Sequence, residues 1–132
     1  MEVKRNESTE LRREGGRVMD APVVPINIPE FMRQIKNEPA WENSDRNAMT
    51  VYKTEVMRIV LVALHKEAVL EEHTANGVIS VQLLDGEINF DSEGKIFHLK
   101  KGEMITLHRK LPHKIVALEE SIFLLTVAGF KD

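Results

Sequence analysis

The pattern of apolar and polar residues from Asn47 onward is typical of β-structure. Short runs rich in β-branched and aromatic residues alternate with turn-forming pairs such as Asp85-Gly86. The clearest two-residue period lies in residues 79–83, where Ile, Val and Leu alternate with Ser and Gln, as in a strand with one buried face. The predicted strands are 49–53, 57–64, 69–73, 78–84, 87–90, 95–99, 104–108, 114–118 and 122–127. Strands of this length and spacing, with no long helical pattern between them, predict an all-β sandwich or barrel.

The segment before this β-rich region is polar and carries charges of both signs. Residues 1–27 are predicted to form a flexible arm, interrupted by Gly15-Gly16, because so little apolar surface cannot offset the entropy of ordering it. Within the arm, residues 22–26 are apolar but punctuated by proline, so at most they form an edge strand. An arm ordered by a partner subunit is the alternative.

One short helix is predicted over residues 29–37. Asn27 offers an N-cap and Pro29 suits a first turn. Phe31 and Ile35 are four residues apart, so they share one helix face and are expected to pack on the core as a lid. We therefore assign residues 28–132 to a single domain that includes this helix.

Composition narrows the classes of function. With 132 residues, 42% of them hydrophobic, the chain suffices for one compact domain. Its 18 basic and 21 acidic residues argue against a nucleic-acid partner, which needs a clustered basic surface. No apolar run approaches the ~20 residues that span a bilayer, so no membrane partner is expected. Cysteine is absent, which excludes disulfides and thiolate chemistry and is compatible with the cytoplasmic location we expect.

Two segments carry a more specific pattern, from Glu67 to Gly86 and from Gly102 to Ala117. They resemble the two signature motifs of the cupin superfamily, G-x5-H-x-H-x3-E-x6-G and G-x5-P-x-G-x2-H-x3-N. The anchors that match without an insertion are His73, Gly86, Gly102 and His113. The resemblance covers residues 47–128 and implies a small single-domain cupin, whose fold is a double-stranded β-helix (jelly-roll) barrel. The two glycines are expected in tight turns with positive φ.

The resemblance also implies where a metal site would lie. In cupins, three histidines and a glutamate converge inside the barrel on Fe, Mn, Ni, Cu or Zn. Here His73 and His113 occupy two of these positions, whereas Ala75 and Ile79 stand where the second histidine and the glutamate are usual. Two imidazoles alone bind a metal weakly, since catalytic zinc sites use three protein ligands. His108 is a candidate third ligand that would rebuild the site.

Two functions follow from these residues. In the first, the barrel binds a small molecule without catalysing a reaction, and His73, His113, Gln82 and His108 provide polar contacts to a polar or anionic ligand. In the alternative, the protein is a metal-dependent enzyme of the dioxygenase or isomerase type. That enzyme would use His73, His113 and a rebuilt third ligand to hold one divalent transition metal. The resemblance further implies a homodimer.

Overall fold

The computed structural model describes residues 4–6 and 17–129. Within them the chain forms two short helices and three antiparallel sheets. The elements are β1 (Lys4–Asn6), β2 (Arg17–Asp20), α1 (Ile28–Ile35), α2 (Pro39–Asn43), β3 (Arg46–Lys53), β4 (Met57–Leu64), β5 (Val69–His73), β6 (Val78–Asp85), β7 (Glu87–Ser92), β8 (Lys95–Lys100), β9 (Met104–Leu107), β10 (His113–Ala117) and β11 (Ser121–Ala128). All nine strands predicted after Asn47 are present, with bounds that differ by a few residues at most.

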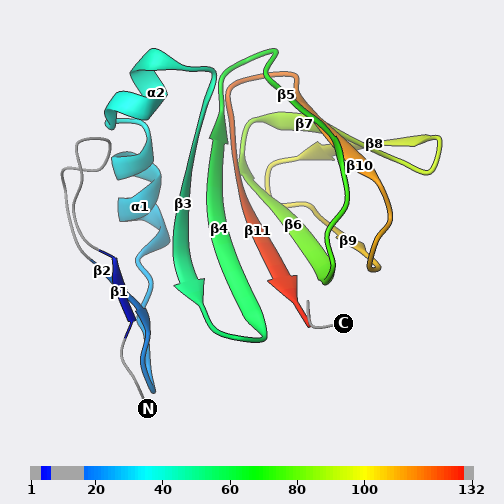
Figure 1. Ribbon diagram of the computed structural model, residues 1–132. Helices are drawn as coiled ribbons and strands as arrows, with labels where there is room; N and C mark the ends of the chain where they lie inside the picture. Colours follow the sequence, from blue (N-terminus) through cyan, green and yellow to red (C-terminus); the bar gives the residue numbers. More distant parts are fainter. Residues whose placement is uncertain (1–3, 7–16, 130–132) are drawn as a thin grey trace.

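Two sheets face each other and enclose the barrel interior (Figure 1). The larger has the strand order β3-β4-β11-β6-β9, and the smaller has the order β5-β10-β7-β8. Strands far apart in sequence therefore pair, as β11 does with both β4 and β6. This arrangement confirms the predicted all-β fold and the double-stranded β-helix of the cupins.

The hydrophobic core has two parts, one on each face of the larger sheet. Inside the barrel, alternate residues of β6 pack with Phe90, Phe123 and other apolar side chains. On the outer face, Leu61 and Ile122 pack with Ile35 of α1 and Trp41 of α2. Because β4 and β11 are covered on both faces, these strands are apolar at successive positions instead of alternating.

The predicted helix is present as α1. The Asn27 side chain accepts a hydrogen bond from the Glu30 amide at 3.1 Å, which satisfies one of the unpaired N–H groups at the helix start. Ile35 is fully buried and Phe31 packs beside it on the outer-face cluster, so the expected lid is confirmed. The second helix, α2, begins at Pro39, since proline is tolerated in a first helical turn.

The N-terminal region differs from the sequence-based prediction. Residues 22–26 form no strand, and the strand instead precedes them as β2, which pairs with β1. The Arg17 guanidinium donates from Nε to the Thr50 carbonyl of β3 at 2.8 Å, which links β2 to the larger sheet. The remainder of the predicted arm, 1–3 and 7–16 with Gly15-Gly16, lies outside the described residues. The domain boundary at residue 27 stays a prediction.

Candidate functional site

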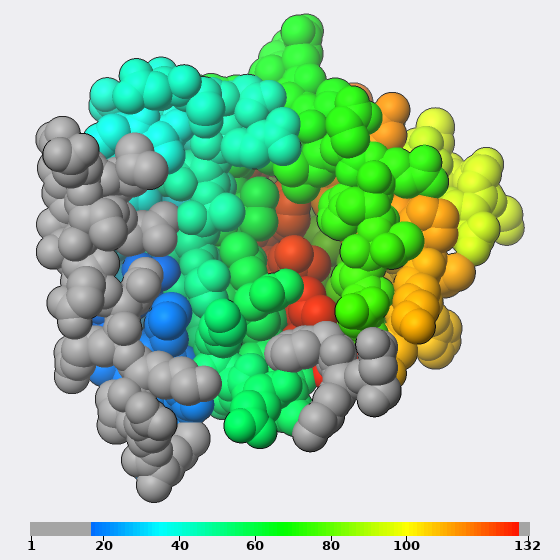
Figure 2. Space-filling model, in the orientation of Figure 1, coloured from blue at the N-terminus to red at the C-terminus, as the bar shows by residue number. Residues whose placement is uncertain are grey.

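A cavity of ≈ 390 Å³ opens at one end of the barrel. Its walls come from both facing sheets and from the loop between β5 and β6. The lining residues are Arg58, His73, Thr74, Ala75, Asn76, Ile79, His113, Leu125 and Val127. Figure 2 shows the surface hollowed between β4 and β5, with part of β11 visible at the floor. The four positions aligned with the cupin ligands all line this one cavity.

The pairing of β5 with β10 brings the two retained histidines together. His73 and His113 are direct partners in the antiparallel register. Their ring centroids are 4.2 Å apart, with an interplanar angle of 60°, an edge-to-face arrangement. The predicted His73–His113 pair is therefore a real cluster, formed by residues from two different strands.

Backbone carbonyls hold both imidazoles in place. His73 Nδ1 lies 2.9 Å from the Glu71 carbonyl oxygen, and His113 Nδ1 lies 3.2 Å from that of Leu111. A carbonyl can only accept, so in both rings Nδ1 carries the proton and donates. In the neutral ring, Nε2 then keeps its lone pair and can accept a hydrogen bond or bind a metal.

His113 is the more enclosed ring of the pair. Its side chain is 4% exposed, and it stacks on the buried ring of Phe90 at a centroid distance of 5.5 Å. Burial lowers the pKa of His113 because the imidazolium loses hydration, and the nearby His73 lowers it further, against the opposing effect of the hydrogen bond to Leu111. His113 is consequently a neutral imidazole at neutral pH.

The donor set of the cavity does not fit the metal of the cupin family. Ala75 and Ile79 carry no donor atom at the other two ligand positions. Across residues 4–6 and 17–129, no group of three or more His, Cys, Asp or Glu side chains is placed to hold a metal ion. Two imidazoles are one ligand short of the three that a catalytic zinc site uses.

The other two predicted site residues lie elsewhere, and their assignment is corrected. Gln82 alternates with Ile79, Val81 and Leu83, which point into the barrel, so its side chain lies on the outer face of β6. His108 is exposed in the turn after β9 and is not among the residues that line the cavity. Neither side chain lines the cavity beside His73 and His113.

Arg58 is a cavity residue that the sequence analysis missed. It pairs with Val127, and Val127 pairs in turn with Ile79, so the three share the inner face of the larger sheet. In the sequence, the feature that distinguishes Arg58 is that it is a single basic residue near the start of an otherwise apolar run. Because β4 is apolar on both faces, alternation alone could not assign Arg58 to the inner face.

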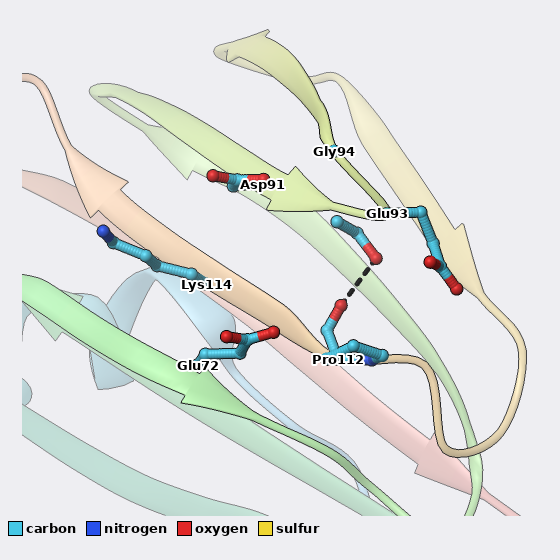
Figure 3. A pocket seen from close by; sticks show the side chains of 7 residues that line it. Glu72, Asp91, Glu93, Gly94, Pro112 and Lys114 are labelled. Atoms are coloured by element: carbon cyan, nitrogen blue, oxygen red, sulfur yellow. Dashed lines mark hydrogen bonds between the residues drawn. The ribbon is translucent and has the colours of Figure 1, made fainter.

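A second hollow of ≈ 350 Å³ lies on the outer face of the smaller sheet. Figure 3 shows Glu72 of β5, Lys114 of β10 and Asp91 of β7 beside one another, with Glu93 in the adjoining hairpin. Ser92 donates to the Pro112 carbonyl at 2.6 Å. Three of the four charged side chains that line this hollow are carboxylates. The barrel cavity, which has an apolar wall and a buried imidazole, is the candidate functional site.

The architecture and the position of this cavity define the class of protein as a small barrel with the cupin fold. A cupin-2 domain protein from Shewanella frigidimarina is similar in structure, with a TM-score of 0.63 and 15% identity over 78% of this chain and 93% of that one. A cupin superfamily protein from Desulfitobacterium hafniense gives a TM-score of 0.62 at 15% identity, over 65% of this chain and 78% of that one. KdgF from a Halomonas species gives a TM-score of 0.61 at 21% identity, over 67% of this chain and 82% of that one.

These likenesses confirm the cupin fold expected from the two motifs. No protein-family model matches the sequence, and no curated protein matches it significantly. Within the described residues, no helix is long and apolar enough to cross a membrane.

Proposed function

We propose that this protein binds a small polar or anionic molecule in the open end of its barrel, without metal-centred catalysis. The observation that carries the proposal is the convergence of four motif positions on one cavity, where two imidazoles are kept and the other two ligands are replaced by Ala75 and Ile79. Such a cavity retains hydrogen-bonding groups while it lacks the donors of a metal centre.

The composition of the cavity suits a small ligand. Its ≈ 390 Å³ lies near the lower end of the roughly 300–1,000 Å³ typical of ligand pockets. Ile79, Leu125 and Val127 supply an apolar wall, and His73 with His113 supply polar contacts. A mainly apolar pocket with a few placed polar groups is the usual form of a small-molecule site.

A metal-dependent enzyme is the second candidate, and one observation favours it. Both imidazoles donate their Nδ1–H to a backbone carbonyl, which is how ligating histidines are commonly oriented. Elemental analysis of the purified protein beside a His73→Ala, His113→Ala double variant separates the two candidates. About one equivalent of metal per chain, lost in the variant, would support the enzyme and contradict a metal-free site.

Blocking the cavity provides the direct test of ligand binding. An Ala75→Phe variant should fill the space between the imidazoles and the apolar wall, and thereby abolish the stabilisation given by small acids and polyols in a thermal-shift screen. The matched control is Gln82→Ala, on the outer face of β6, which should bind like the wild type. If the Phe variant keeps every ligand response of the wild-type protein, the barrel cavity is not the binding site.

A further inference from the structure

We infer that the free edge of β8 is a dimerisation surface, on which a second copy of this chain pairs its own β8 in the antiparallel direction. The described lining of the barrel cavity does not include β8, so this surface is independent of the proposed ligand site. Three features of β8 carry the inference: its exposed apolar side chains, the direction of its backbone groups, and the charges at its two ends.

β8 is an edge strand with exposed apolar side chains. Within the described residues it pairs only with β7, and Figure 1 shows the β7–β8 hairpin projecting from the rest of the barrel. Ile96 is 65% exposed and Phe97 is 42% exposed, on opposite faces of the strand. Lys95 and Lys100 stand at the ends of the strand, so neither charge lies at its centre. Such an edge is a template for pairing with another strand.

The backbone of β8 allows only some registers. Glu93 and Gly94 form a two-residue turn with φ of 52° and 74°, and Ser92 and Lys95 on either side of it are direct partners. Such a turn is closed by hydrogen bonding between its flanking residues, and hydrogen-bonded pairs alternate along an antiparallel ladder. The backbone groups of residues 96, 98 and 100 therefore point to the free edge, and a second β8 must meet them with the same set.

This condition places the twofold axis of the dimer on a residue of β8. A register shifted by one would set a residue whose backbone groups point outward against one whose groups point to β7. An axis at Phe97 pairs residues 95–99 of the two copies, and an axis at His98 pairs residues 96–100. An axis nearer either end of the strand pairs fewer residues, so these two registers are the ones to compare.

The charges beside β8 favour the axis at Phe97. In that register Glu93 of each copy comes opposite Lys101 of the other, so opposite charges meet at both ends. With the axis at His98, Lys95 comes opposite Lys101 instead, and like charges meet at both ends. Cross-strand pairs of opposite charge stabilise a sheet and pairs of like charge destabilise it. The axis at Phe97 also sets the two Phe97 side chains against each other, which removes apolar surface from water.

The size of this surface predicts a reversible dimer, because small interfaces are weak. Sedimentation of the full chain from micromolar to millimolar concentration should show a monomer–dimer equilibrium. Phe97→Lys, which brings two lysines together at the axis, should weaken association by roughly tenfold or more. Met104→Lys is the matched control, since Met104 is 53% exposed on the other edge strand, β9, and should associate like the wild type. A wild-type chain that stays monomeric at every concentration would overturn the inference.

Reversing the end charges tests the register without changing an apolar residue. Glu93→Lys and Lys101→Glu should each weaken association by roughly tenfold, because each brings like charges together at both ends of the interface. The double variant exchanges the signs and should associate like the wild type. A double variant that associates no better than either single variant would overturn the register with its axis at Phe97.

The absence of cysteine from the chain allows a direct test of the axis. A residue on the axis faces itself, at a Cα separation of roughly 4.5 Å in a non-hydrogen-bonded pair, which a disulfide can span. Phe97→Cys should therefore form a disulfide-linked dimer under mild oxidation with diamide. Ile96→Cys and His98→Cys, each of which faces a different residue, should cross-link much more slowly. Cross-linking of either control as fast as that of Phe97→Cys would overturn the axis at Phe97.

Discussion

At the scale of single residues, the fold controls the protonation of His113. The residue is 4% exposed, and its ring contacts both the Phe90 ring and the His73 ring. Both the missing hydration and the nearby imidazole disfavour a positive charge. The side chain therefore offers an acceptor at Nε2 under conditions where an exposed histidine is partly protonated.

The first prediction follows from this lowered pKa. The pKa of His113 should lie below the 6.5 usual for histidine, as measured by NMR titration of its ring protons. In the unfolded chain the ring binds a proton more tightly than in the folded protein, so acid favours unfolding. The stabilising contribution of neutral His113 is complete above pH 6.5 and is lost as the pH falls through the lower folded pKa.

Urea unfolding at several pH values measures this contribution. The free energy of unfolding of the wild type should decrease between about pH 7 and about pH 5 more steeply than that of a His113→Asn variant, which cannot take up the proton. Other titrating groups are common to both proteins and cancel in the difference. Identical slopes for the two proteins would contradict a lowered pKa at His113.

At the scale of elements, two glycine turns have the same dihedral angle and different surroundings. Gly86 and Gly102 both have φ of 91°, as their motif positions predicted. A Cβ atom at Gly86 would lie 2.3 Å from the Glu120 carbonyl oxygen and 2.3 Å from Ser121 Oγ, whereas at Gly102 nothing lies within 4 Å. At position 86, glycine is therefore required both by the positive φ and by the close contact with the chain at residues 120 and 121. At position 102, only the positive φ requires it.

The two alanine variants should separate these requirements. Gly102→Ala should lower the free energy of unfolding by about 1–2 kcal/mol, the cost of a left-handed conformation for an L-residue. Gly86→Ala should lower it by clearly more, because the β6–β7 turn must also move away from the start of β11. Chemical denaturation of both variants checks the order, and equal losses would show that the close contact at Gly86 is relieved without cost.

Other elements show why the local sequence pattern predicts only part of the structure. The strands from Met57 to Leu64 and from Val69 to His73 have the bounds that the sequence pattern predicts. In contrast, β1 and β2 contain few apolar residues, and the contact that fastens β2 is a hydrogen bond from Arg17 to the distant Thr50. A long-range polar contact leaves no periodic signal in the sequence, so the hairpin was not predicted.

At the scale of the whole molecule, topology decides which residues meet. The motif spacing identified the fold and placed His73 and His113 together, because both are anchored to the β5–β10 pair. It did not identify Arg58, whose inner-face position depends on how β4 pairs with β11. It also left open which face of β6 carries Gln82, and the packing of Ile79, Val81 and Leu83 inside the barrel settles that question.

If the barrel has kept the geometry of the cupin site and lost only its ligands, one substitution should restore metal binding. Ala75 lines the cavity beside His73 and His113, at the position of the second histidine of the motif. Ala75→His would supply a third imidazole and reach the three ligands of a catalytic zinc site. Its affinity for Zn²⁺, measured by competition with a chromophoric chelator, should exceed that of the wild type by roughly tenfold or more.

The control is Asn76→His, because Asn76 also lines the cavity but is not at a motif position. This variant should give a smaller increase in affinity for Zn²⁺. Equal increases would mean that the cavity no longer keeps the geometry of the ligand positions.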